Sequence, residues 1–595
     1  MLIIHDASLQ QWLRYDGPAA VIIAHSPAEV LPALEAVQRQ VDAGKHAAGF
    51  VAYEAAPGCD PSLVTRADES GFPLLWFGLY DRPSTYTLPD APQRPAIAWR
   101  PSISQTDYCR QITAIKAQIA AGNTYQVNFS LRLRAKLPAD PWGLFLQMVQ
   151  AQSADYGAFV DLGDWAIACA SPELFFSRQG ADHDPEKDHH IVSKPMKGTV
   201  PRGLNLYEDA RQAAWLRASE KNRAENAMIV DMVRNDLGRV ATLGSVEVPR
   251  LFDLERYPTV WQMTSTVQGR TQASTADLFG ALFPPASITG APKSRTMGLI
   301  AQLEDSPRRI YTGTIGFMRP DGRSQFNVAI RTVLIDRRRQ VAEYGVGGGI
   351  VWDSQASEEY AECCAKAQVL HHQRPRFSLL ESLRWTPETG YFLLERHLER
   401  LCQSAEYFGF CCDRQAVLQW LDRIVLPQAV RQAPGQVVTP DISPVKPLKV
   451  RLMLTASGQV SGEVVALPPS SPLTVCVAPQ PVSASDVFLH HKTTHRQAYD
   501  QARQSAPSGI HDVILWNERG ELTESTLGNL VVEIAGVRYT PPLSCGLLPG
   551  TFRAHLLDQG LLQERVILRS ALEEGDRLFI INSVRGWQDA TLKAL

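Results

Sequence analysis

Apolar positions in the first 370 residues follow two periods. Ile112, Ile115 and Ile119 recur at helical spacing within residues 107–120, which predicts an amphipathic helix. Residues 127–137 then alternate apolar and polar side chains, the pattern of an antiparallel strand with one buried face. The same criteria predict further strands at 157–170, 310–318, 324–336 and 340–351, and helices at 207–240, 292–304 and 355–370. Many strands with helices grouped between them indicate a large α+β fold rather than a doubly wound sheet.

A second domain is predicted to begin near residue 377. Over residues 377–410 an apolar strand, a turn, a second strand and an amphipathic helix follow one another, as at the start of a new folding unit. The preceding residues 371–376 are short, polar and contain proline, which is typical of a linker. We therefore divide the chain into domains 1–373 and 374–595.

Composition narrows the class of protein. Of 595 residues, 45% are hydrophobic and 20% charged, which excludes a disordered or collagen-like chain. A net charge of −3 gives no field that would draw the protein to nucleic acid or anionic lipid. No apolar run reaches the ~18 residues of a membrane span, and the first residues, MLIIHDASLQ, lack the basic leader of a signal peptide. We therefore expect a cytoplasmic protein without a membrane or nucleic-acid partner.

Two carboxylates interrupt the apolar face of a predicted helix. In residues 221–240 the side chains of Glu225 and Asp236 fall within a stripe of methionine, isoleucine and valine. A carboxylate on a buried face is costly unless it is paired or bound to a cation. A structural ion pair with Arg223 or Arg234 explains the pattern, and so does a metal-binding or catalytic role.

Three other segments combine basic side chains with exposed backbone amides. Lys197, beside a glycine in PMKGT, can supply an ammonium or, when deprotonated in a dry pocket, a nucleophile. Residues 287–293 (SITGAPK) end a loop and open a helix, where free N–H groups bind anions. The glycines Gly347–Gly349 offer another backbone surface. A solvated lysine and plain bends explain each feature singly; together they suit a small polyanionic substrate with a divalent cation.

Taken in order, the motifs resemble one family. They are SPE at 171–173, PMKGT at 195–199, RAENAMIVDMVRNDLGRV at 223–240, SITGAPK at 287–293, AIRT at 329–332 and GGGIVWDSQASEEYAE at 347–362. This set is similar to the chorismate-utilising enzymes, which include anthranilate synthase component I, isochorismate synthases and aminodeoxychorismate synthase component I. The resemblance is confined to a core of residues 105–370. It implies a large α/β sandwich that binds chorismate and Mg²⁺.

The resemblance assigns roles to three carboxylates. Glu225 and Glu362 would hold Mg²⁺, which prefers hard oxygen ligands. By spacing alone, Glu362 could equally form a surface ion-pair ladder with Glu358 and Lys366. Glu173 would act as the acid/base at the 4-hydroxyl of the substrate, a task that needs a raised carboxyl pKa. The implied substrate-binding residues are Arg331, Gly347, Gly348, Gly349, Thr289, Gly290 and Lys293.

Lys197 selects among the reactions of the family. Anthranilate synthases carry alanine at this place, whereas aminodeoxychorismate synthases carry a lysine whose amine is thought to attack C2 and expel the 4-hydroxyl. Lys197 therefore favours formation of 4-amino-4-deoxychorismate. One departure accompanies it: Gln262 replaces a histidine that many relatives use in pyruvate elimination, and a glutamine cannot shuttle protons.

The second domain carries a lysine, an acid in a Gly/Ser/Thr loop and a Gly-Thr pair before a helix. Lys492 lies in HHKTTHR, Glu524 in ELTESTLGNL, and Thr551 in GLLPGTFR. By chemistry alone these could form a phosphate-cofactor site, or could be two hairpin turns and a surface lysine. The set resembles fold-type IV PLP enzymes over 377–590, which implies a two-subdomain α+β domain. It assigns Lys492 to the PLP Schiff base, Glu524 to the pyridine nitrogen, Arg400 and Thr551 to the phosphate, and Arg585 to a substrate carboxylate.

The order of the two domains suggests consecutive reactions. A domain that makes aminodeoxychorismate, followed by a family that includes aminodeoxychorismate lyase, would produce 4-aminobenzoate and pyruvate for folate biosynthesis. The alternative is an anthranilate- or isochorismate-type synthase joined to a class IV aminotransferase. None of the ten cysteines lies in a Gly-x-Cys-x-Gly elbow, so we expect a separate glutamine amidotransferase subunit to supply ammonia. Fold-type IV relatives are usually dimers, which makes a homodimer through the PLP domain a further expectation.

Overall fold

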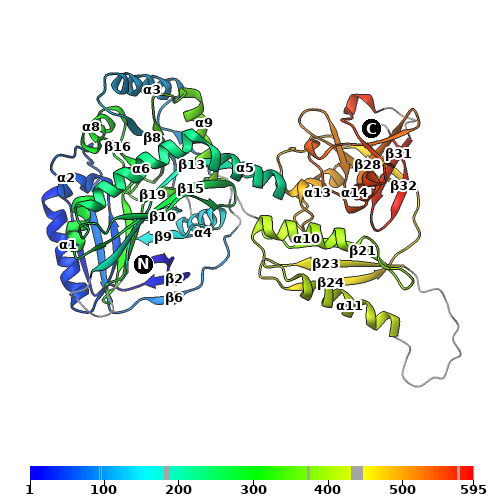
Figure 1. Cartoon of the computed structure of the whole chain (residues 1–595), viewed down its shortest axis with the longest axis horizontal. Coiled ribbons are helices and arrows are strands. Elements are labelled where there is room, and N and C mark those ends of the chain that lie inside the picture. The colour runs from blue at the N-terminus through cyan, green and yellow to red at the C-terminus, as the bar shows by residue number, and fades with distance from the viewer. Residues whose placement is uncertain are drawn as a thin grey trace. The chain divides into compact units, whose positions relative to one another are not determined.

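The computed structural model divides the chain into two compact units (Figure 1). The first comprises Met1–Pro201 and Gln212–Arg374, and the second Arg202–Arg211 and Pro375–Leu595. The structure describes the chain except residues 93, 95–96, 138–139, 180–187, 372–374, 431–446, 573–576 and 594–595, and the side chains of 426–430. The boundary expected between residues 373 and 374 lies outside the described residues, whereas the decapeptide at 202–211 joins the second unit from within the predicted first domain.

Two ten-stranded antiparallel sheets form the framework of the first unit. The first sheet has the order β16 (Gly290–Ala291), β8 (Gln126–Lys136), β20 (Val341–Ile350), β19 (Thr332–Asp336), β10 (Trp165–Ser171), β9 (Tyr156–Asp161), β1 (Leu2–Asp6), β2 (Gln11–Tyr15) and β6 (Ser84–Tyr86), with β7 (Arg100–Pro101) beside β8. The second has the order β13 (Met196–Pro201), β15 (Val260–Thr271), β12 (His189–Lys194), β11 (Leu174–Gln179), β18 (Ser324–Asn327), β17 (Thr314–Met318), β4 (His46–Val51), β5 (Leu75–Tyr80) and β3 (Ala20–Ala24), with β14 (Glu247–Arg256) beside β15.

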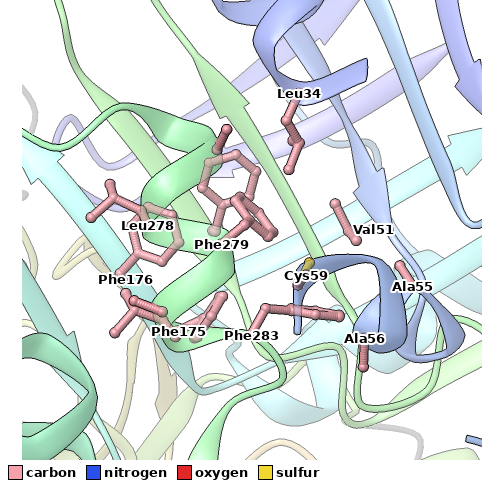
Figure 2. Packing of buried hydrophobic residues seen from close by; sticks show 14 of the residues in the cluster. Leu34, Val51, Ala55, Ala56, Cys59, Phe175, Phe176, Leu278, Phe279 and Phe283 are labelled. Atoms are coloured by element: carbon pink, nitrogen blue, oxygen red, sulfur yellow. The ribbon is translucent and has the colours of Figure 1, made fainter. Parts of the chain in front are cut away.

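The two sheets pack face to face and helices cover their outer faces. Side chains of β1 and β4, such as Ile4 and Phe50, share one buried cluster between the sheets. Figure 2 shows the cluster outside the second sheet, where Phe176 of β11 packs against Phe279 of α7, and to which Leu34 of α1 also belongs. The helices of this unit are α1 (Pro27–Asp42), α2 (Ala56–Cys59), α3 (Gln105–Ala120), α4 (Pro141–Gln152), α6 (Glu220–Gly238), α7 (Thr275–Leu282), α8 (Lys293–Leu303) and α9 (Ala356–Ala367). This arrangement confirms the predicted α/β sandwich.

Some predicted elements are divided in the structure. The helix expected at 207–240 is two helices, α5 (Leu206–Ala218) and α6, because the Ser219 side chain caps the second one. The strand expected at 157–170 is the hairpin β9–β10, and 324–336 contributes one strand to each sheet. Strand 127–137 is β8, but its polar face is buried as well: Arg132 is 1% exposed and pairs with Glu304 at 3.1 Å. The prediction of a half-buried strand was therefore wrong, because an internal ion pair satisfies the polar positions.

The second unit contains two smaller sheets. A four-stranded antiparallel sheet has the order β22 (Gly390–Tyr391), β21 (Leu379–Thr386), β23 (Leu448–Leu454) and β24 (Val460–Ala466), and α10 (Leu394–Phe408) and α11 (Arg414–Val430) pack on it. A mixed eight-stranded sheet has the order β27 (Leu522–Ser525), β26 (Asp512–Trp516), β25 (Leu473–Val477), β32 (Gly586–Leu592), β31 (Arg577–Asn582), β28 (Asn529–Ile534), β29 (Val537–Thr540) and β30 (Gln563–Glu564). With α12 (Val487–His490), α13 (Gln497–Gln504) and α14 (Thr551–Asp558) it forms the second of the two predicted subdomains.

The segment Arg202–Arg211 is bound into the second unit by polar and ring contacts. The guanidinium of Arg202 lies 4.3 Å from the ring centroid of Tyr407, whose hydroxyl donates to the carbonyl of Gly203 at 2.7 Å. No helix among the described residues of either unit is long and apolar enough to cross a bilayer.

Candidate active sites

Lys197 lies on a bulge of β13. The register of β13 against β15 pairs Met196 with Thr264 and Thr199 with Gln262, so one residue is extra between these pairs. Gly198 takes a φ of +103°, which favours glycine at this point. The Gln262 amide donates to the carbonyl of Gly198 at 2.8 Å and accepts from the Thr199 hydroxyl at 2.8 Å. A bulge changes the direction in which a strand presents its side chains. The two hydrogen bonds of Gln262 stabilise the bulge at Lys197.

The amine of Lys197 faces a carboxylate and a glycine. Its Nζ is 3.3 Å from Oε2 of Glu225, on α6, and both side chains are largely buried. A Cβ atom on Gly349 of β20 would come within 2.4 Å of Nζ. A side chain at 349 would therefore displace the amine from this position. The pairing also accounts for Glu225 on the apolar face of its helix, although its partner is Lys197 and not the expected arginines.

Glu173 is a buried acid in the turn between β10 and β11. It is 4% exposed, and its Oε1 accepts a hydrogen bond from the Ser287 hydroxyl at 2.6 Å. Burial raises its pKa to about 7, although Ser287, the amide of Met196 and the charge of Lys197 oppose the shift. A carboxyl with such a pKa can hold and release a proton near neutral pH.

Helix α9 contributes a second group of charges. Oε1 of Glu362 is 2.6 Å from Nζ of Lys366, which also donates to the carbonyl of Gly347 at 2.8 Å. Burial opposes ionisation of Glu362, but Lys366, Lys197 and Lys221 together lower its pKa. The i, i+4 pair considered for Glu362 is thus present, and it lies in the wall of a cavity.

One cavity of about 210 Å³ gathers most of the predicted residues of the first unit. Its wall includes Glu173, Lys197, Glu225, Gln262, Arg331, Gly347, Gly348, Gly349 and Glu362. Among the described residues no group of three or more acidic, histidine or cysteine side chains is arranged to hold a metal ion. Glu225 and Glu362 still supply oxygen donors, and Mg²⁺ commonly takes only one or two protein carboxylates, with water and substrate completing its shell.

Three predicted substrate-binding residues are elsewhere. The Thr289 hydroxyl bonds within its own turn, Gly290 pairs with Val127 in the sheet, and Lys293 forms an ion pair with Asp236 at 2.7 Å. None of the three lines the cavity, to which the SITGAPK segment contributes Ser287 and Ile288; contact of the three with the substrate stays a prediction. Asp236, the other carboxylate on the apolar face of α6, is explained by Lys293 as a structural ion pair.

Several lining residues were not predicted. The largest are Tyr311, Tyr344, Lys221, Glu359 and Lys366. Glu359 falls within the motif at 347–362, so helical spacing of three from Glu362 could have identified it. The tyrosines come from strands and turns distant in sequence, and no local pattern distinguishes them from core aromatics.

Lys492 is the central amine of a second cavity, of about 540 Å³, in the second unit. It follows α12, and its backbone carbonyl accepts a hydrogen bond from the amide of Leu380 at 2.9 Å. Burial, and next the charge of Arg400, lowers the pKa of its amine to about 8. No carboxylate among the described residues lies within ion-pair distance of it, so the amine can exist uncharged near neutral pH.

Glu524, on β27, is the buried acid of this cavity. It is 3% exposed, and its carboxyl accepts from the Tyr499 hydroxyl at 2.8 Å and from the backbone amide of Leu548 at 3.0 Å. Burial raises its pKa to about 7, against those hydrogen bonds and the charge of Lys492. A buried carboxyl of this kind can hydrogen-bond a ring nitrogen.

Arg400 is held at the other end of the cavity by Glu381. The guanidinium donates from Nε at 2.9 Å and from Nη2 at 2.7 Å to the two carboxylate oxygens. Although burial alone would raise it, Arg400 and His397 lower the pKa of Glu381 to about 2. His397 also lies 3.3 Å from the hydroxyl of Thr551 at the start of α14. A fixed arginine beside a helix N-terminus suits a phosphate group.

All five residues predicted for the second site line this cavity: Arg400, Lys492, Glu524, Thr551 and Arg585. The sequence did not identify Glu381, His397 and Tyr499, which orient them. Glu381 is a single acid in the buried strand LLESL, and that anomaly could have marked it.

Two family models match the chain. Residues 84–372 match the chorismate binding enzyme family, and residues 378–592 match amino-transferase class IV. Residues 84–372 therefore resemble one family and residues 378–592 the other.

Individual relatives cover only part of it. Aminodeoxychorismate synthase component 1 of Klebsiella aerogenes is 38% identical over 304 residues, 50% of this chain and 64% of the relative. Anthranilate synthase component 1 1 of Haloarcula marismortui is also 38% identical, over 45% of this chain and 53% of the relative. The chain thus spans less than two thirds of these curated relatives. The crystal structure of anthranilate synthase component I from Streptococcus pneumoniae shares the fold of the first unit (TM-score 0.52, 24% identity, 62% of this chain and 92% of that chain).

Proposed function

We propose that the first unit converts chorismate and ammonia into 4-amino-4-deoxychorismate and that the second converts this product into 4-aminobenzoate and pyruvate. Identity alone does not choose between aminodeoxychorismate and anthranilate formation, because relatives with both names are 38% identical to this chain. The observation that carries the proposal is the amine of Lys197, aimed by its bulge into a cavity whose wall also holds Glu173.

In the first reaction Lys197 acts as the nucleophile. Its nitrogen forms a bond to C2 of the ring as the bond from C4 to the hydroxyl oxygen breaks, and Glu173 donates the proton with which the hydroxyl leaves as water. Ammonia then bonds to C4, and the bond from C2 to the lysine nitrogen breaks to regenerate the amine. Burial of Glu173, with its pKa of about 7, keeps a proton available for the first of these steps.

Mg²⁺ fits the donor set of this cavity. Glu225 and Glu362 would hold the ion, and their negative charges are balanced by Lys197 and Lys366 in the structure described here. The ion would screen a carboxylate of chorismate. Arg331 and the amides near Gly348 remain proposed contacts for the substrate carboxylates.

Pyridoxal 5′-phosphate fits the second cavity. Arg400 and Thr551 would bind its phosphate, Glu524 its ring nitrogen, and Lys492 its carbonyl carbon; when bound, it supplies an electron sink. Lys492 removes the proton from C4 of the substrate, for which a pKa of about 8 is suitable. Pyruvate leaves as the ring becomes aromatic, and no second keto acid is consumed.

The remaining partners are proposals as well. The first-domain relative in Klebsiella is named as component 1, and this chain has no Gly-x-Cys-x-Gly elbow. Both points support a separate glutamine amidotransferase that supplies ammonia. A homodimer through the second unit and a cytoplasmic location stay predictions.

Product analysis tests the proposal. The full chain is incubated with chorismate, an ammonium salt and Mg²⁺, with and without pyridoxal 5′-phosphate. We expect 4-aminobenzoate and pyruvate in equal amounts with the cofactor, and 4-amino-4-deoxychorismate without it. Anthranilate as the product in either case would instead support the anthranilate-type alternative, and turnover only on adding a keto acid would support an aminotransferase.

A further inference from the structure

Four cationic side chains line one part of the second cavity: Lys449, Arg451, Arg496 and Arg585. Glu524 is the single acidic side chain among the described residues of the wall. Such an excess of one charge in a concave site raises the local concentration of oppositely charged ligands. The cations therefore indicate that the part of the ligand bound beside them is anionic.

These cations are additional to those that serve the cofactor site. Arg400 is neutralised by Glu381, with both guanidinium–carboxylate bonds under 3 Å, at 2.7 and 2.9 Å. Lys492 is the reacting amine of the proposed function. The four side chains thus remain for the substrate.

The fold delivers two of them on one strand face. In LKVRLML of β23, the residues flanking Lys449 and Arg451 (Leu448, Val450 and Leu452) are buried, and Val450 and Leu452 belong to the core formed with α10 and α11. Lys449 and Arg451 alternate with them and line the cavity. Arg451 is paired across the ladder with Ser382 of β21, another lining residue. The polar face of this sheet therefore faces the cavity.

The other two cations, Arg496 and Arg585, come from the second subdomain and line the same cavity. Arg585 lies in the turn between β31 and β32, where its side chain donates to the carbonyl of Pro468. Arg496 precedes α13 and donates to the carbonyl of Thr526 at 2.6 Å. These bonds to neutral carbonyls orient the two guanidinium groups; that of Arg496 also lies 4.6 Å from the ring centroid of Tyr499, and its charge acts on Glu524.

The cluster is close enough for mutual repulsion. Burial lowers the pKa of Lys449, and Arg451, Arg585 and Arg496 lower it further, against the charge of Glu463 alone. Arg451 contacts Glu463 at 3.5 Å on an exposed surface, where an ion pair contributes little. Like charges gathered this way are stabilised when an anion binds among them.

We propose that Lys449, Arg451, Arg496 and Arg585 bind the carboxylates of an amine that carries two of them, and so select the substrate of the second unit. The proposal rests on the proposed function, since 4-amino-4-deoxychorismate has one carboxylate on its ring and another on its enolpyruvyl group. Monocarboxylic amino acids offer a single carboxylate beside the amine and would leave part of the cluster unpaired. A dicarboxylic amino acid such as L-glutamate shares the chemistry and is the other source of such a ligand.

Kinetics of the full-length holoenzyme test whether the four cations bind the substrate carboxylates. Lys449→Met and Arg451→Met are expected each to raise KM for 4-amino-4-deoxychorismate about tenfold, with kcat within about twofold. Lys449→Arg should restore most of the affinity because it restores the charge. Arg577→Gln is the matched control: Arg577 is on β31, exposed, and pairs with Glu533 at 3.2 Å. If KM is unchanged in both methionine variants and pyruvate is still released, the four cations do not bind the substrate carboxylates. The proposed function would not be affected by that result.

A binding measurement separates the two proposals. Isophthalate, a dicarboxylate, and benzoate, a monocarboxylate, are titrated against the holoenzyme by calorimetry. We expect isophthalate to bind at least about tenfold more tightly, and this preference to disappear in Lys449→Met. Preference for isophthalate together with reaction of L-glutamate, but no pyruvate from 4-amino-4-deoxychorismate, would overturn the proposed function while the dicarboxylate site remains. Equal binding of the two acids would overturn the site.

Discussion

The two cavities place a lysine in opposite electrostatic surroundings. Around Lys197 the described wall carries four carboxylates and three other basic side chains, and Glu225 lies 3.3 Å from the amine. Around Lys492 the described wall carries five other basic side chains and one carboxyl, and burial with Arg400 lowers the amine pKa to about 8. The first cavity can accept a cation beside its substrate, whereas the second favours the uncharged amine and an anionic ligand.

The difference shows how surroundings, rather than residue type, set the chemistry of an amine. The first lysine is positioned by a strand bulge and a carboxylate, and its reaction requires release from that partner. The second lacks any such partner among the described residues, so burial, together with the charges of Arg400 and Arg496, disfavours its charged form. If the two cavities work as proposed, each can be disabled without affecting the other.

Replacing Lys492 should have the largest effect. In Lys492→Ala we expect pyruvate release to fall at least ~10³-fold, because base and cofactor attachment are lost together, while 4-amino-4-deoxychorismate accumulates. Pyruvate is measured with a coupled dehydrogenase and the intermediate by chromatography. Lys593→Ala, an exposed lysine of the same unit, should behave as the unchanged chain. Loss of both reactions in Lys492→Ala would contradict independent sites.

Replacing Lys197 should disable the first reaction and leave the second unaffected. Lys197→Ala should reduce formation of 4-amino-4-deoxychorismate by ~10²–10³-fold, since the nucleophile is absent. Release of pyruvate from added 4-amino-4-deoxychorismate should not change. Lys194→Ala serves as the control, because Lys194 lies three residues earlier and its amine is 3.7 Å from Glu255. Undiminished amination at C4 in Lys197→Ala would exclude the covalent route.

The pH dependence of the first reaction should report Glu173. Its pKa is raised to about 7 by burial. The protonated form, which proton donation requires, therefore predominates below pH 7, and its fraction falls as the pH rises through 7. The rate should therefore fall about tenfold per pH unit well above 7. In Glu173→Gln the rate should be low and independent of pH over the same range. A wild-type rate that rises from pH 7 to 9 would assign the acid to another group.

Gln262 should have a smaller effect, through the bulge. Gln262→Ala removes the two hydrogen bonds that hold Gly198 and Thr199, and we expect kcat of the first reaction to fall about tenfold with KM within twofold. Gln268→Ala, on the same strand and bonded to exposed Glu247, is the matched control. Equal kinetics of the two variants would show that the bulge is held by other contacts.

Removing a buried ion pair should affect stability more than either reaction. Glu304 is 3% exposed and contacts Arg132 at 3.1 Å and Arg308 at 2.6 Å. Glu304→Gln should lower the free energy of unfolding of the first unit by about 3–5 kcal/mol, because it leaves two buried cations underpaired. Breaking the exposed pair of Arg338 with Asp164 by Asp164→Asn should cost under ~1 kcal/mol. Denaturant unfolding measures both, and equal costs would refute the distinction.

Local patterns in the sequence predicted much of the fold. The helix at 107–120 and the strand at 340–351 correspond to α3 and β20 within two residues, because their apolar periods reflect burial directly. The division of 324–336 between two sheets could not be predicted that way. Its two strands are both buried although the first, SQFN, is mostly polar, and Arg331, at φ +52°, lies in the connection between them.

The sites were predictable where a residue type is unusual in its setting. Glu225 and Asp236 interrupt one apolar stripe, yet one faces the cavity and the other pairs with Lys293. Both carboxylates look alike along the chain, because a helical wheel reports which face is buried and not what lies opposite. The same limit led to Thr289, Gly290 and Lys293 being expected at the substrate.

The sequence by itself determined which residues we propose for the chemistry: the lysines 197 and 492, their neighbouring acids and the order of two domains, all identifiable from motifs in the chain. Only the tertiary structure decided which charges meet. Lys197 contacts Glu225 from another element, Arg400 is bound by Glu381, and Lys449 lies with Arg496 and Arg585 on one cavity. The strength of an electrostatic interaction depends on the distance between the charges and on their burial. The spacing of residues along the chain predicts neither quantity.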